Sequence, residues 1–202
     1  MYEPTEECIN DFWKNGILKK LPVSSSNPNF VKAASQLKYS CEDNTTCGEI
    51  LREDYNRLFA GQALPLAPAY ESQYQNNGQP KKGQNAGSVT DFYNSYGWEY
   101  KYKGRIMDDH LGIELLFLTI LIEKYLVIDD FACLVEMRGE IRRFIDQHIL
   151  SWVPEWNNNI QHYAKTLCYK GIGTLIFACV EDIYSFLGQK ITASHQSDNP
   201  KN

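Results

Sequence analysis

Clusters of positive charge are missing from this sequence. Its 20 lysines and arginines are outnumbered by 25 aspartates and glutamates, which gives a formal net charge of −5, and no block of basic residues occurs. Proteins that bind nucleic acid need clustered cations to neutralise the phosphates. The composition therefore argues against a nucleic acid partner, and it slightly favours a basic one.

Long hydrophobic runs are also missing. The first residues, MYEPTEECINDFW, are acidic and contain neither the positively charged region nor the apolar region of a signal peptide. The longest uncharged apolar run of the second half covers residues 115–122, whereas a membrane span needs roughly 20 residues. We therefore expect a cytoplasmic protein without membrane insertion, in which residues 115–122 form a buried helix.

Motifs for metals, nucleotides and catalysis are absent or incomplete. The six cysteines have no C-x-x-C spacing, so free, buried thiols are expected in a protein without an export signal. Residues 78–85, GQPKKGQN, imitate the glycine spacing of a phosphate-binding loop, but Gln84 stands where that loop requires a lysine. No G-x-S-x-G motif of a serine hydrolase occurs. These absences predict a protein that needs no cofactor, carries no stoichiometric metal and hydrolyses no nucleotide.

Apolar residues at helical spacing are abundant. They recur three or four positions apart in segments that start at typical helix caps and end at glycines. The first such face consists of Ile9, Phe12, Trp13 and Ile17. The predicted later starts are Asn27-Pro28, the box Thr46-Cys47-Gly48-Glu49, Ser88, Asp129-Asp130 and Thr174, and the predicted ends are Gly61, Gly97 and Gly188. Since no segment alternates as a strand would, the sequence predicts an all-α helical bundle of about eight to ten helices.

A single domain is expected to cover residues 1–190. Residues 76–88, NNGQPKKGQNAGS, are polar, rich in glycine and interrupted by a proline, which is typical of a flexible loop or hinge. The polar residues 191–202 predict a disordered tail.

The stretch DDHLGIELLFL, residues 108–118, places two carboxylates and an imidazole in front of the most apolar helix. Asp109, His110 and Glu114 are potential metal ligands, but a zinc site usually needs a further histidine from another element. Asp109 and His110 could also exchange a proton, although no nucleophile in a recognisable setting accompanies them. The structural alternative is that Asp108 or Asp109 caps the helix, where its charge meets the positive end of the helix dipole. Taken alone, the stretch favours the cap.

Three segments together resemble one family. Residues 55–74, YNRLFAGQALPLAPAYESQY, are similar to the pattern Y-x-x-L-F-x-G-P-x-x-L-x-A-P-P-Y-E-S-V-Y of the TorD/DmsD chaperones. Residues 107–118, MDDHLGIELLFL, resemble that family's P-x-D-H-L-x-x-E-L segment, and residues 148–176 look like its H-L-x-x-W-x-P region. The resemblance covers residues 46–187 with the motifs in the same order, which is more specific than any single motif.

The resemblance implies a non-enzymatic cytoplasmic chaperone of molybdopterin-dependent oxidoreductases. Such a chaperone binds the twin-arginine signal peptide and the body of its client, assists cofactor insertion and prevents premature export through the Tat pathway, as a monomer or homodimer. The matching positions would form the peptide-binding site, and they are Tyr55, Leu58, Phe59, Tyr70, Glu71, Ser72, Asp109, His110 and Glu114. Prolines of the family pattern are replaced by Gln62, Ala69 and Met107, the last of which is expected to loosen the hinge that poses Asp109 and His110.

Two other functions stay open at this point. An α-helical adaptor could join two proteins through an aromatic surface, with residues 108–110 serving only as a helix cap. A small metal-dependent hydrolase could use Asp109, His110 and Glu114. A metal measurement separates the hydrolase from the other two, and capture of a molybdoenzyme catalytic subunit separates the chaperone from the adaptor.

Overall fold

The computed structural model describes residues 25–40, 47–61, 65–75, 88–101 and 103–189, together with Thr5 and Glu7. Within these residues the regular elements are helical, and the β pairings are two isolated bridges. The seven α-helices are α2 (Pro28–Lys38), α3 (Cys47–Tyr55), α4 (Val89–Ser95), α5 (Leu111–Leu126), α6 (Phe131–Phe144), α7 (Val153–Tyr163) and α8 (Leu167–Gly188). Shorter helical segments are η2 (Asn56–Ala60), η3 (Glu71–Gln73) and η5 (Ile145–Ile149). The all-α class is confirmed, and the described residues contain seven of the eight to ten helices predicted for the whole chain.

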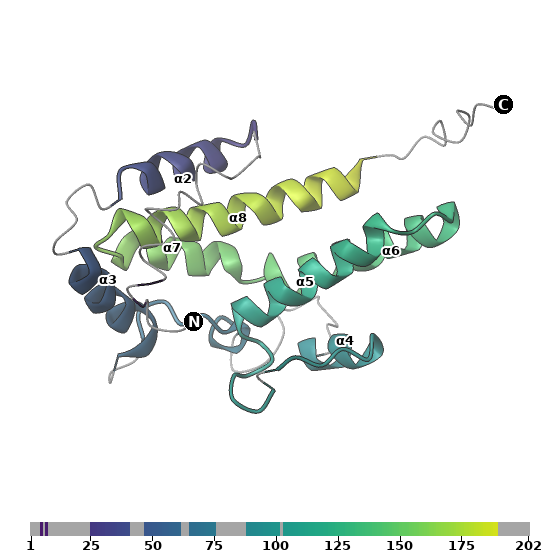
Figure 1. Ribbon diagram of the computed structural model, residues 1–202, viewed down its shortest axis with the longest axis horizontal. Helices are drawn as coiled ribbons and strands as arrows, with labels where there is room; N and C mark the ends of the chain where they lie inside the picture. The colour runs from purple at the N-terminus through teal and green to yellow at the C-terminus, as the bar shows by residue number, and fades with distance from the viewer. Residues whose placement is uncertain are drawn as a thin grey trace.

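Helix α8 is the longest element, with α2 along one side and α7 along the other (Figure 1). At the start of α2, the Asn27 amide donates to the Ala178 carbonyl at 3.3 Å and to the Asp182 carboxylate at 2.9 Å. Near its end, Gln36 accepts a hydrogen bond from the Thr174 hydroxyl at 3.3 Å. Helices α2 and α8 therefore run antiparallel.

Helix α8 begins about two turns earlier than the sequence predicted. It starts at Leu167, whereas Thr174 was the expected start because Gly171 and Gly173 looked like a break. Both glycines are buried inside the helix. A Cβ atom on Gly171 would lie 2.5 Å from Leu37 Cγ, and Gly173 approaches α7 with similar closeness. The prediction was wrong because these glycines serve helix packing and do not end a helix.

Helices α5 and α6 are joined by a short turn and pack against each other, and η5 continues α6 towards α7. The second half of this long stretch carries Ile141, Phe144, Ile145 and Ile149, each completely buried, as their spacing predicts. The first turn of α6 instead leaves Phe131 exposed. The second half of α6 and η5 therefore contribute to the core, whereas the first turn of α6, next to the end of α5, lies outside it.

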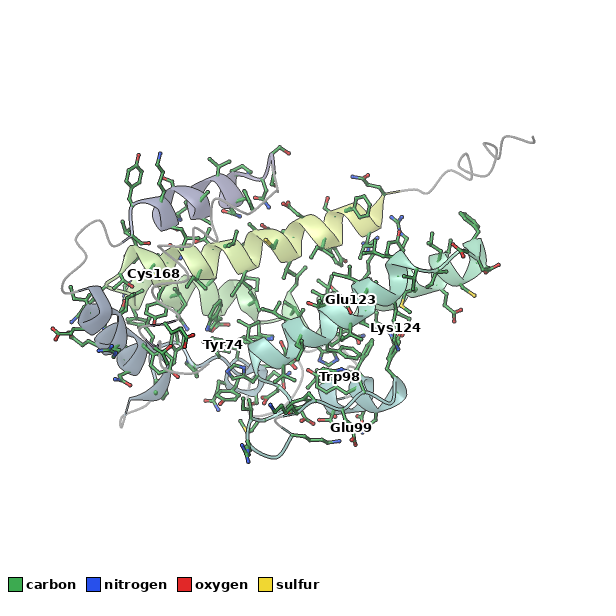
Figure 2. The ribbon with its side chains drawn as sticks, viewed as in Figure 1. Tyr74, Trp98, Glu99, Glu123, Lys124 and Cys168 are labelled. Atoms are coloured by element: carbon green, nitrogen blue, oxygen red, sulfur yellow. The ribbon has the colours of Figure 1, made fainter. Side chains whose placement is uncertain are left out.

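An aromatic cluster joins α4 to α5. Phe117 of α5 is completely buried and contacts the rings of Phe92, Tyr93, Tyr96, Trp98 and Phe144, with ring centroids 4.8–6.1 Å apart. Figure 2 shows Trp98 next to α5, on the same side as Lys124. The Lys124 ammonium lies 5.3 Å from the centroid of the Tyr96 ring, a cation–π distance. The segment after α4 is thus held against α5.

Several predicted helix ends have the expected local chemistry. The Asn27 side chain caps α2, Ser88 forms a capping box with Asp91 at the start of α4, and Asp130 caps α6. Gly97 follows α4 with a φ of 59°, a conformation that favours glycine. These predictions are confirmed. They could be made from the sequence because each helix end depends only on residues that are close together in the chain.

The expectation of buried cysteines is partly wrong. The described thiols are free: Cys168 is buried, Cys179 is half-buried and Cys133 is exposed. Figure 2 shows Cys168 at the end of α8 that lies near α3. Cys133 is exposed because it belongs to the first turn of α6, which lies outside the core.

Helix α8 is the one helix of the described residues that is long and apolar enough to cross a membrane, judged by length and composition alone. A core helix of a water-soluble fold passes the same test. Helix α8 packs against α2, α6 and α7, and it leaves Leu167 and Phe186 at its two ends exposed.

Some predicted features lie outside the described residues. They are the amphipathic stretch 9–17, Thr46 of the capping box, most of the loop 76–88 and the tail 191–202. The extent of the single domain, residues 1–190, stays a prediction.

Candidate functional site

Two segments far apart in the sequence are paired at the start of α5. Tyr70 and His110 form an isolated antiparallel bridge. The Glu71 amide donates to the Asp109 carbonyl at 2.9 Å, and the Leu111 amide donates to the Ala69 carbonyl at 2.9 Å. The segment that carries the tyrosine–glutamate–serine triplet and the segment that carries the aspartate–histidine pair are therefore held side by side.

Asp108 fixes this junction to α4 and to the loop that follows it. Its carboxylate accepts hydrogen bonds from the Thr90 hydroxyl and the Tyr100 hydroxyl, both at 2.7 Å. Its backbone carbonyl accepts a third bond from the Tyr93 hydroxyl at 3.0 Å. Because both carboxylate oxygens are engaged, Asp108 acts as an anchor of the site.

A cleft of about 630 Å³ opens between the junction and the start of α4. Its walls are residues 71, 72 and 75, residues 88–90 and residues 104–109, with His148 of η5 behind them. The carboxylates among these lining residues are Glu71, Asp108 and Asp109, and the permanent cation is Arg105. With three acids against one base, the cleft favours a positively charged ligand.

Asp109 presents a half-exposed carboxylate in this cleft. One oxygen accepts a hydrogen bond from the Ser72 amide at 3.0 Å. The other has no hydrogen-bond partner among the described residues. Asp109 is therefore oriented by the paired segment and keeps one oxygen for a ligand.

Glu71 supplies a second carboxylate, which is almost fully buried at 4% exposure. One of its oxygens accepts a hydrogen bond from the Gln75 amide at 2.8 Å, and the other lies 3.2 Å from His148 Nδ1. Buried carboxylates are costly unless they are paired in this way. The pairing holds Glu71 in place against the cleft.

Glu114 is a third carboxyl group near the cleft, more deeply buried than Glu71. It is completely buried, and one carboxyl oxygen accepts a hydrogen bond from the Trp152 indole at 3.2 Å. Burial, together with the charges of Glu71 and Asp109, raises the pKa of Glu114 well above its ordinary value. The buried carboxyl group of Glu114 therefore resists ionisation, and it supports the site from within.

The helix cap at the start of α5 is His110, and the prediction of Asp108 or Asp109 as the cap is wrong. His110 Nδ1 accepts a hydrogen bond from the Gly112 amide at 3.0 Å. Burial lowers the pKa of His110 to about 4, so that this nitrogen is unprotonated and can accept. The physical reason is tertiary: the side chains of Asp108 and Asp109 are drawn away by Thr90, Tyr100 and the Ser72 amide.

The candidate metal ligands are not gathered around one point. His110 turns its nitrogen to its own helix, Asp109 faces the cleft and Glu114 contacts Trp152. Among the described residues, no group of three or more histidine, cysteine, aspartate or glutamate side chains is placed to hold a metal ion. The geometry of these three residues gives no support to a hydrolase.

The remaining residues of the predicted site lie apart from the cleft or behind it. Leu58 is completely buried and Tyr55 nearly so, and the Phe59 ring packs 5.6 Å from the Tyr169 ring of α8. Tyr70 is half-buried, with its ring edge-on to His110 at 5.0 Å. Of the predicted residues, Glu71, Ser72 and Asp109 line the cleft.

Sequence reasoning missed His148 as a part of this site. Its imidazole lines the cleft and contacts Glu71, 77 positions away in the sequence. The available signal was its place at the start of the third family-like segment, residues 148–176. His148 belongs to η5, which is a π-helical turn, and such turns are often found at functional sites.

Comparison with known proteins places this chain among relatives. A family model described as "Nitrate reductase delta subunit" matches residues 26–158, which is more than half of the chain. A protein named "Chaperone protein TorD" from Psychrobacter sp. (strain PRwf-1) is 29% identical over 133 residues, which are 65% of this chain and 59% of that protein.

A second protein of that name, from Vibrio cholerae serotype O1 (strain ATCC 39541 / Classical Ogawa 395 / O395), is 24% identical over 185 residues, which are 90% of this chain and 80% of that protein. A third, from Vibrio cholerae serotype O1 (strain M66-2), is 26% identical over 133 residues, which are 66% of this chain and 58% of that protein. For the first and third relatives, the match therefore spans less than two thirds of their length. The family match covers both paired segments of the cleft and His148, and the chain belongs to the nitrate reductase delta subunit family, the family of the TorD and DmsD chaperones.

Proposed function

We propose that the protein is a cytoplasmic, non-enzymatic chaperone for the maturation of a molybdopterin-dependent oxidoreductase. In this function it binds the twin-arginine signal peptide of the client and holds the client until the cofactor is inserted. The support is the family membership together with the names of the relatives, each of which is called a TorD chaperone.

The observation that carries the peptide-binding part is the acidic cleft. A twin-arginine peptide offers two adjacent guanidinium groups followed by apolar residues. Asp109 supplies a half-exposed carboxylate in which one oxygen has no hydrogen-bond partner among the described residues. Glu71 lies beside it, because the Glu71 amide donates a hydrogen bond to the Asp109 carbonyl. An arginine matches a carboxylate through two parallel hydrogen bonds, which makes the contact geometrically selective.

Apolar contact must supply the rest of the affinity. An exposed arginine–carboxylate pair contributes only about 1 kcal/mol, whereas apolar burial contributes roughly 25 cal/mol per Å². In the cleft, Met107 is 54% exposed and Ile106 is half-buried beside it. We assign the apolar residues of the peptide to this wall, because Leu58 and Tyr55 are buried in the core.

The test is a titration of a synthetic peptide with an arginine pair followed by leucines, against wild type and Asp109→Asn. The variant loses the charge but keeps a carbonyl oxygen for the Ser72 amide, so the fold should persist. We expect it to bind about 5- to 30-fold more weakly, which is roughly 1–2 kcal/mol. The same peptide with two lysines should bind wild type more weakly than the arginine peptide, because lysine lacks the planar fork.

Asp130→Asn is the matched control. It removes the same charge from an exposed helix cap outside the cleft, where asparagine caps as well as aspartate. Its affinity should equal that of wild type. Equal affinity for both peptides across all three proteins would contradict the proposed site, and failure to capture a molybdoenzyme catalytic subunit from cells that make one would contradict the proposed client.

A further inference from the structure

The first half of α6 turns an apolar face to solvent. Phe131 and Val135, one helical turn apart, are 45% and 48% exposed, and Val127 at the end of α5 is 77% exposed. The tip at which α5 meets α6 extends past the end of α8 along the long axis of the molecule, and the end of α8 meets α6 only at Arg138 and beyond (Figure 1). Single exposed apolar residues are ordinary, whereas a row of them marks an interaction surface. We call the row from Phe131 to Arg142 the α6 face.

A groove runs along the α6 face beside the end of α8. Its volume is about 410 Å³, and its walls include Phe131, Val135 and Gly139 of α6 and Leu187 of α8. No neighbouring element of the described residues comes within 4 Å of the position that a Cβ atom on Gly139 would take. The groove therefore has room beside Gly139 for an apolar side chain that comes from outside.

The two ends of the α6 face carry opposite charges. Asp129 is exposed just before α6, and Arg142 lies in its last turn, where the guanidinium stacks on the Tyr184 ring at 4.5 Å. Among the described residues, neither charge has an ion-pair partner. At 1.5 Å per residue, Asp129 and Arg142 each lie roughly 10 Å from Val135, in opposite directions along the helix. Val135 therefore marks the middle of a face that is acidic at one end and basic at the other.

A two-fold axis at Val135 matches each of these features with its complement. When α6 of a second copy packs antiparallel on the first, Val135 of one copy meets Val135 of the other. Phe131 of each copy then lies level with Gly139 of the other, where the groove has room. Asp129 of each copy lies level with Arg142 of the other. Each contact occurs twice, because a two-fold interface uses the same residues on both copies, whereas parallel packing would bring like charges together.

We propose that the α6 face binds a second copy of this chain, and that the two copies form a two-fold dimer with α6 packed antiparallel on α6. The dimer is independent of the proposed function. The α6 face lies near the end of α5 and the acidic cleft lies at its start, so the 16 residues of α5 separate them by about 24 Å. Each copy therefore keeps its cleft open, and the dimer offers two.

Analytical ultracentrifugation of the full chain tests the dimer. Because the interface is small, we expect a dissociation constant on the order of micromolar, with the mass rising from one chain to two between about 1 and 500 µM. Val135→Glu places two carboxylates against each other on the axis and should weaken the dimer by at least about tenfold. Val31→Glu is the matched control, at a valine of α2 that is 59% exposed, and it should dimerise as wild type does.

An exchange of charges tests the antiparallel register. Asp129→Lys alone and Arg142→Glu alone each place like charges together at both ends of the interface, so each should weaken the dimer about tenfold. The double variant exchanges the two charges and should recover an affinity within about threefold of wild type. Such recovery requires two copies, because Asp129 and Arg142 are about 20 Å apart in one chain.

The outcomes separate this inference from its alternatives. A wild type that stays a single chain at every concentration would overturn it and leave the α6 face to a client or to another segment of the same chain. A dimer that survives Val135→Glu, or a double charge variant that does not recover, would overturn it as well. If Val135→Glu loses its helical circular dichroism, the charge variants decide. Asp109→Asn should dimerise as wild type does, so a dimer that fails to bind the arginine peptide would contradict the proposed function alone.

Discussion

Replacing Gly171 by alanine should destabilise the protein, although alanine is the better helix former. A Cβ atom on Gly171 would lie 2.5 Å from Leu37 Cγ and 3.1 Å from the Leu37 backbone nitrogen. Leu37 is 1% exposed and cannot swing out of the way, so α2 must move away from α8. Inserting a methyl group into such a contact lowers the free energy of unfolding by about 1–3 kcal/mol. The higher helix propensity of alanine offsets about 1 kcal/mol of this loss.

Gly139→Ala is the matched control for this prediction. Gly139 lies inside α6, is exposed, and has no atom within 4 Å of the position of a new Cβ. Alanine there should stabilise the protein by about 0.5–1 kcal/mol, because it restricts the unfolded chain and favours the helix. The two substitutions are chemically identical, so their difference isolates the contact between α2 and α8.

Urea denaturation followed by circular dichroism measures both effects, since helices dominate the fold. We expect the midpoint of Gly171→Ala to fall and that of Gly139→Ala to rise. The double variant Gly171→Ala, Leu37→Ala should be more stable than the sum of its single changes predicts, because the smaller residue removes the clash. If Gly171→Ala were as stabilising as Gly139→Ala, the close approach of α2 to α8 would be refuted.

Two further predictions concern pH and stability. Burial alone would raise the pKa of Asp54, but hydrogen bonds from Arg57, Thr166 and Lys165 lower this pKa overall. The ionised carboxylate therefore stabilises the fold above the ordinary aspartate pKa, and this stabilisation is lost as the pH falls below about 4. Asp54→Ala should cost about 2–4 kcal/mol at pH 7, measured by urea denaturation, and a loss below 0.5 kcal/mol would show that the link between α3 and α8 is unimportant. Burial lowers the pKa of His110 from 6.5 to about 4, so the unfolded chain binds more protons between these values and stability should fall as pH decreases from 6.5 to 4. His110→Asn, which retains a helix cap, should lose part of this pH dependence, and an unchanged dependence would place its origin elsewhere.

The sequence by itself determined the helical class and many helix ends. Asn27, Ser88 and Asp130 satisfy the amides of residues two or three positions ahead, and Gly97 takes a positive φ. Such interactions are local, so they can be read from neighbouring letters. The order of the three family-like segments also identified the family.

Only the tertiary structure decided how the acidic residues are used. The sequence suggested Asp108 or Asp109 as a helix cap, but Thr90, Tyr100 and the Ser72 amide engage their carboxylates and leave the cap to His110. These partners come from other parts of the chain, and a hydrogen-bond donor at such a separation leaves no periodic trace in the sequence.

The same limit applies to burial and to close packing. Leu58 and Tyr55 belong to a family-like motif, yet both are buried in the core and neither lines the cleft. Gly171 was predicted to interrupt a helix because glycine commonly does so. The sequence cannot show that Leu37 of α2 occupies the space where a side chain would lie. His148 reaches Glu71 because α6 continues through a π-helical turn into the core. Local chemistry thus decided which helices form, whereas packing between them decided which side chains meet in the cleft.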